Sequence, residues 1–88
     1  MPQDAAKAVE WFEKAASRKD LGAVMELGIM FRDGKYLPPD REKAFHWFEK
    51  GAEWKDPYSM AALADMLLEG TPSAEQAARA LALYREAA

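Results

Sequence analysis

The sequence contains no cysteine and a single histidine. Without cysteine, the chain can form no disulfide, no thiolate metal site and no cysteine nucleophile, but the cellular compartment is left open. The first residues also lack the basic and then apolar pattern of a secretory signal. Cytoplasmic is therefore the default location, and a periplasmic or secreted location stays open if the sequence is a fragment.

An excess of basic charge and long apolar runs are missing as well. The 12 Lys and Arg residues face 15 Asp and Glu residues, for a net charge of −3, and the two signs are interleaved along the chain. This balance argues against a nucleic-acid partner, which usually selects a basic stripe. Half of the residues are hydrophobic, but the composition is that of a globular domain and predicts no membrane span.

What the sequence does contain is an internal repeat. Residues 43–50 (KAFHWFEK) have a close counterpart at residues 7–14 (KAVEWFEK) and a weaker one at residues 79–86 (RALALYRE), so the copies begin 36 residues apart. A fixed period of this length is typical of repeat arrays, in which each unit buries its apolar face against its neighbours.

Apolar residues recur at helical spacing in five segments, and capping or turn residues separate these segments. The predicted helices run from Asp4 to about Lys19, from Asp20 to Asp33, and onward from Asp40, from Asp56-Pro57 and from the capping box of Ser73 and Gln76. We expect Gly34 and Gly70 to follow the second and fourth helices, and Tyr36–Pro39 to form a stiff connector.

These helices predict an all-α fold, an α-α superhelix or solenoid of antiparallel helix pairs with about two and a half repeats. Each full repeat has a first helix (helix A) and a second helix (helix B). Residues 1–20 form a half repeat with helix B alone, and residues 21–56 and 57–88 each form a repeat with helices A and B. All three belong to a single domain. Gly28 and Gly51 fall on the buried faces, where we expect two helix axes to come close. The aromatic pairs Trp11-Phe12 and Trp47-Phe48 should fill the volume beside them.

The residues also resemble a known family. Residues 23–34 carry Leu27-Gly28, Phe31 and Gly34, and they are followed by Asp40, Lys43-Ala44 and Trp47-Phe48. This order is similar to the Sel-1-like repeat (SLR) branch of the tetratricopeptide repeat (TPR) superfamily, over essentially the whole chain. The chain departs from the family pattern at Tyr36-Leu37, at Gln76 and at Leu83.

The resemblance implies a right-handed superhelical stack whose A helices line a concave surface that holds peptides or protein segments. It also implies the role of a non-catalytic adaptor or assembly scaffold, often bacterial. The A-helix positions left for a partner, together with an aromatic residue that has no repeat counterpart, are Met25, Ile29, Arg32, Tyr58, Asp65, Leu68 and Trp54. Two alternatives remain open: Met25 and Ile29 complete the core, and Trp54 packs onto Tyr58.

No set of residues predicts chemistry. His46 falls on the solvated face of its helix, and no acid, base and nucleophile are spaced to converge. We therefore predict no catalytic residue, no metal ligand and no cofactor. The leading hypothesis is a protein-binding module that uses the concave A-helix surface. The alternative is a structural segment of a longer repeat scaffold, which acts by end-to-end stacking or self-association.

Overall fold

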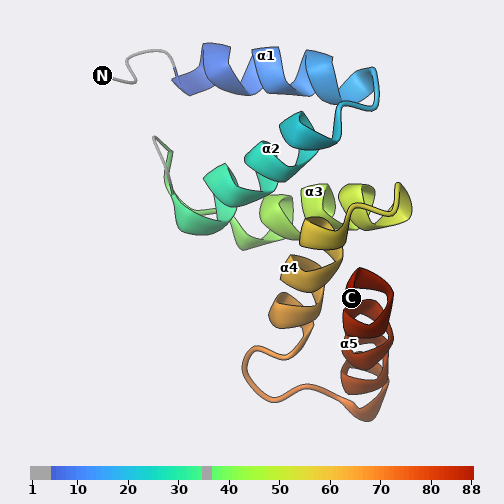
Figure 1. Cartoon of the computed structure of the whole chain (residues 1–88). Coiled ribbons are helices and arrows are strands. Elements are labelled where there is room, and N and C mark those ends of the chain that lie inside the picture. The colour runs from blue at the N-terminus through green and yellow to red at the C-terminus, as the bar shows by residue number, and fades with distance from the viewer. Residues whose placement is uncertain (1–4, 35–36) are drawn as a thin grey trace.

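The computed structural model describes residues 5–34 and 37–88, and within these residues it contains helices and no strands (Figure 1). The helices are α1 (Ala5–Ser17), α2 (Leu21–Asp33), α3 (Arg41–Glu53), α4 (Pro57–Leu67) and α5 (Ala74–Ala87). The predicted all-α fold with five helices is confirmed. Asp4 and Tyr36, at which the predicted first helix and the predicted connector begin, lie outside the described residues.

Side-chain caps fix where four of the helices begin. The carboxylates of Asp20, Asp40 and Asp56 each accept a hydrogen bond from the backbone amide three residues on, at 3.3, 3.1 and 3.0 Å. Ser73 and Gln76 form the predicted capping box, in which each side chain accepts from the other residue's amide. These contacts satisfy amides that the first helical turn leaves without partners.

The helices end in two ways. Gly34, with φ of 72°, takes the left-handed conformation directly after α2, as predicted. The fourth helix ends sooner than its counterpart, because the amide of Leu68 is shared between the carbonyls of Ala64 and Asp65 at 3.2 Å. Gly70 is also left-handed, with φ of 70°, but it lies in the turn beyond the helix end.

Successive helices pack mainly on the next helix along the chain, from α1 at the top of Figure 1 to α5 at the lower right. The fully buried side chains at the centre include Phe48, Leu27 and Leu63. A Cβ added to Gly28 would lie 2.6 Å from the Phe48 ring, and one added to Gly51 would lie 2.1 Å from the hydroxyl of Ser59. The glycines therefore stand where neighbouring helices approach closely, as predicted.

The expected burial of Trp11 is wrong. Its side chain is 74 % exposed, whereas Trp47, at the same position of the next repeat, is partly buried against the core. The order of the repeats accounts for the difference: Trp47 lines a cavity together with residues at the end of α1, the helix one repeat earlier. Trp11 belongs to α1 itself, and no helix precedes α1 among residues 5–34 and 37–88.

Candidate protein-binding surface

The A helices of the two predicted full repeats are α2 and α4. Met25, Ile29 and Arg32 follow one another along α2 at spacings of four and three residues, and each is partly exposed. Ile29 also packs against the buried core. Ile29 therefore contributes to the core and still presents a portion of its side chain to solvent, and its contact with a partner stays a prediction.

The corresponding side of α4 carries more exposed apolar surface. Tyr58, in the first turn, is 43 % exposed, and Leu68, at the end of the helix, is 40 % exposed. Asp65 lies between them and is exposed too. These two exposed apolar side chains, with the charged Asp65 between them, make this side of α4 a candidate for contact with a partner.

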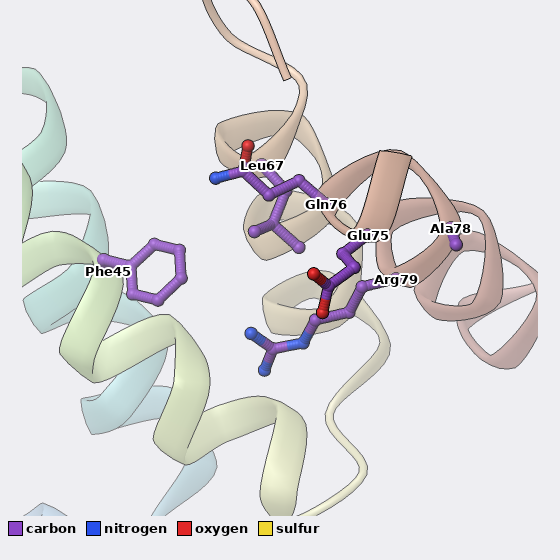
Figure 2. Close-up of a pocket in the computed structure, with 6 residues that line it drawn as sticks. All are labelled: Phe45, Leu67, Glu75, Gln76, Ala78 and Arg79. Atoms are coloured by element: carbon purple, nitrogen blue, oxygen red, sulfur yellow. The ribbon is translucent and has the colours of Figure 1, made fainter. Parts of the chain in front are cut away.

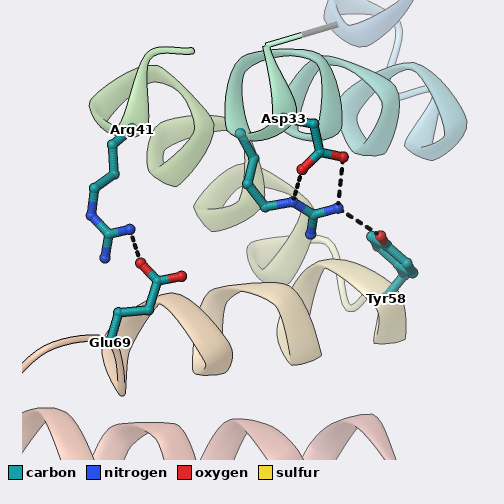
Figure 3. Close-up of polar contacts among 5 residues, drawn as sticks. Asp33, Arg41, Tyr58 and Glu69 are labelled. Atoms are coloured by element: carbon teal, nitrogen blue, oxygen red, sulfur yellow. Dashed lines mark hydrogen bonds and ion pairs between the residues drawn. The ribbon is translucent and has the colours of Figure 1, made fainter.

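Arg32 links the end of α2 to the start of α4. Its guanidinium donates to the carboxylate of Asp33 at 2.9 and 3.3 Å and to the hydroxyl of Tyr58 at 3.4 Å (Figure 3). It also lies 5.5 Å from the centre of the Phe48 ring. The hydrogen bond to Asp33 raises the pKa of Arg32 above its ordinary value and, in the same pair, lowers the pKa of Asp33. Both groups therefore stay charged.

A second polar contact ties α5 to α4. The hydroxyl of Tyr84, a residue that is 36 % exposed, donates to the carboxylate of Asp65. This hydrogen bond is the main reason why the pKa of Tyr84 is raised above its usual value. Tyr84 is not among the residues that the sequence predicts for this surface. The available signal was that Tyr84 brings a hydroxyl to the repeat position held by Phe12 and Phe48.

Trp54 belongs to a different part of the molecule from the other six selected residues. It lines a cavity of about 290 Å³ between α1 and α3, together with Glu13, Ala16, Ser17, Lys19, Trp47 and Lys50. The ammonium of Lys50 lies 5.9 Å from the centre of the Trp54 ring. The ring of Tyr58 has Phe48 as its neighbour, at 6.4 Å between centres.

A larger cavity of about 550 Å³ lies between α3 and α5 near the end of α4 (Figure 2). Figure 2 shows Phe45 on one side and Arg79 with Leu67 on the other, and Glu75, Gln76 and Ala78 complete the lining. Arg79 donates to Glu49 at 3.0 Å, so its charge already has a partner inside the molecule. None of these side chains is among the residues that the sequence predicts for binding, and no spacing in the sequence indicates this cavity.

Among the described residues, no three His, Cys, Asp or Glu side chains gather as metal ligands do. His46 is exposed and meets Trp47 edge-on at 5.1 Å between ring centres. Within the same residues, none of the helices is both long enough and apolar enough to cross a membrane. Among the described residues, the features that remain for function are surfaces: the partly exposed side chains of α2 and α4, and the cavities between α1 and α3 and between α3 and α5.

Comparison with family models assigns the chain to a known family. The family model of the Sel1 repeat matches residues 1–20, 22–53 and 57–88, which is nearly the whole sequence. The chain belongs to the Sel1 repeat family, whose repeats generally mediate protein–protein interaction and are generally not catalytic. Searches of curated proteins and of solved structures gave no match.

Proposed function

We propose that this protein is a non-catalytic interaction module that binds a peptide or protein segment on the side of α2 and α4 described above. The observation that carries the proposal is the pair of exposed apolar side chains on α4, Tyr58 and Leu68. A partner would cover this apolar area and gain the free energy of its removal from water.

The polar groups around these side chains support the same surface. Arg32 fixes Tyr58 through its hydroxyl, and Tyr84 holds Asp65 in the same way from α5. A side chain that is already held in place loses less conformational entropy when a partner arrives. The charged groups at the edge then contribute orientation and association rate more than affinity.

The experiment compares partner capture by the wild type and by surface variants. A partner captured from native lysate is identified, purified and titrated against each variant. Tyr58→Ala and Leu68→Asp are expected to weaken binding by about 30-fold each if these residues anchor the partner. Met25→Asp and Ile29→Asp extend the test to α2.

Leu81→Asp is the matched control, because Leu81 is a leucine of α5 with 53 % exposure. It introduces the same charge at an exposed leucine away from α2 and α4. Circular dichroism checks that every variant keeps its helices. If Tyr58→Ala and Leu68→Asp bind as tightly as Leu81→Asp does, the partner uses another surface.

A second candidate function rests on the exposure of Trp11. The same repeat position in α3, Trp47, is partly buried and lines a cavity beside the helix one repeat earlier. A second copy or a further repeat could cover Trp11 in the same manner, and the protein would then act as a segment of a stacked scaffold. Light scattering on the wild type and on Trp11→Ala tests this: assembly that is lost in the variant supports stacking, and a monomeric wild type at high concentration contradicts self-association.

A further inference from the structure

Two junctions join successive B helices, one between α1 and α3 and one between α3 and α5. They differ in charge at equivalent repeat positions. A lysine in the left-handed conformation follows each of the first two B helices: Lys19 with φ of 63° after α1 and Lys55 with φ of 64° after α3. At the α3–α5 junction, the ammonium of Lys55 lies 3.4 Å from the carboxylate of Glu86. The residue 36 positions before Glu86 is Lys50, so the α1–α3 junction has a lysine where the next junction has a carboxylate.

A second ion pair of the α3–α5 junction is missing from the α1–α3 junction. Arg79 contacts Glu49 at 3.0 Å, and the equivalent residues one repeat earlier are Lys43 and Glu13. Lys43 instead points its ammonium at the ring of Phe31, 5.3 Å from its centre. In the described part of the chain, Glu13 makes no ion pair with it. The α1–α3 junction thus keeps the stacking of the repeat but lacks both ion pairs.

This junction also holds the cavity of about 290 Å³, just below the range of about 300–1,000 Å³ for ligand pockets. Lys19 and Lys50 both line it, and Glu13 is the single acidic side chain in its lining. The apolar part of the lining is formed by Trp47, Trp54 and the buried Ala16. Two ammonium groups therefore border a surface of two indole rings.

We propose that the α1–α3 cavity binds an acidic peptide segment of a partner protein. A carboxylate of the segment would lie between Lys19 and Lys50, in the place that Glu86 takes beside Lys55. An adjacent apolar side chain of the segment would pack on Trp47 and Trp54. The two partly buried indole rings would reduce the contact of the carboxylate with water on one side, which would strengthen its attraction to the lysines.

Charge complementarity selects this occupant. A basic segment would meet two like charges and a single carboxylate, and a neutral segment would leave the two lysines unpaired. The site is distinct from the surface of α2 and α4 proposed above, so the two proposals can fail independently.

The probe is a short blocked peptide of alternating glutamate and leucine, added to the full chain while the indole N–H signals are followed by NMR. We expect the signals of Trp47 and Trp54 to shift and that of the exposed Trp11 to stay unchanged. The same peptide with glutamine in place of glutamate is expected to cause no shift. Sodium acetate alone is the probe for a small carboxylate.

Lys50→Glu should weaken binding of the peptide about tenfold, because the residue then repels the peptide's carboxylate instead of attracting it. It also recreates the Lys55–Glu86 arrangement at the first junction, so the variant is expected to fold. Lys7→Glu makes the same charge change at an exposed site of α1 outside the cavity and should leave binding unchanged. Lys19→Gln is a second variant that weakens binding without adding a negative charge.

The proposal is overturned if the glutamine peptide binds equally well, or if Lys7→Glu weakens binding as much as Lys50→Glu. Equal shifts with acetate at the same concentration would overturn the assignment to a peptide in favour of a small carboxylate. Leu68→Asp separates the two sites: it is expected to leave these indole shifts unchanged, whatever it does to the partner of α2 and α4.

Discussion

Gly51→Ala should destabilise the protein, although alanine is the better helix former. Gly51 lies inside α3 and faces Ser59 of α4, which is 0 % exposed. An alanine Cβ would lie 2.1 Å from the Ser59 hydroxyl oxygen and 2.5 Å from the Ser59 Cβ. Ser59 is also held by its hydrogen bond to Asp56 at 2.6 Å, so it has no free direction in which to move.

The magnitude follows from two opposing terms. Overpacking of this severity belongs at the upper end of the usual range, about 3 kcal/mol. The higher helix propensity of alanine relative to glycine stabilises the folded state by about 1 kcal/mol and offsets part of this loss. The net loss is about 2 kcal/mol, from a total that for a chain of this length is about 4–13 kcal/mol. The midpoint of thermal unfolding should fall by roughly 8–16 °C.

The assay is urea unfolding of four proteins: the wild type, Gly51→Ala, Ser59→Ala and the double variant. The preceding junction holds Ala15 and Ala23 at these two repeat positions. The double variant recreates that pair, so we expect the loss to be about halved relative to the sum of the single variants. Gly22→Ala is the control, since its Cβ would meet only the Asp20 carboxylate, at 3.3 Å. A fully stable Gly51→Ala, or losses that simply add, would refute the close approach of α3 and α4.

Two further predictions concern single side chains. Tyr84 should titrate above the ordinary tyrosine pKa of 10.0 because it donates to Asp65; this contact stabilises the fold below pH 10 and is lost as the pH rises through the raised value. Tyrosinate absorbance should show Asp65→Asn lowering that pKa, and an unchanged titration would contradict the contact. Trp11→Ala should change the free energy of unfolding by less than about 0.5 kcal/mol, whereas Trp47→Ala should cost about 2 kcal/mol. Urea midpoints measure both, and equal losses would show that Trp11 is covered.

The helices could be predicted from the sequence because the signals for them are local. Asp20, Asp40 and Asp56 cap the helices that follow them, and the apolar spacing places each helix between its caps. The glycines at positions 28 and 51 could be predicted as close contacts from the same pattern. Local hydrogen bonds and helical spacing need no knowledge of the rest of the chain.

The repeat pattern does not predict features that depend on how neighbouring helices pack. The period shows that Trp11 and Trp47 hold equivalent positions, but it does not show whether a helix is present to cover each one. The contacts of Arg32 with Tyr58 and of Asp65 with Tyr84 depend on how α4 crosses its neighbours. Residue types alone do not specify that crossing, so the candidate surface could be predicted by its positions and not by its internal contacts.

Because each helix packs mainly on the next helix in the chain, most contacts in this molecule join residues that are close in sequence. Proteins of such low contact order pay little loop-closure entropy before native contacts form, and they fold in microseconds to milliseconds. Among the described helices, α1 and α5 each pack mainly on one neighbour, so opening of this segment should start at α1 or α5 and spread inward, as in a one-dimensional array. Such fraying would reach α2 and α4, which carry the proposed binding surface, directly after the end helices, and it would reach α3 last.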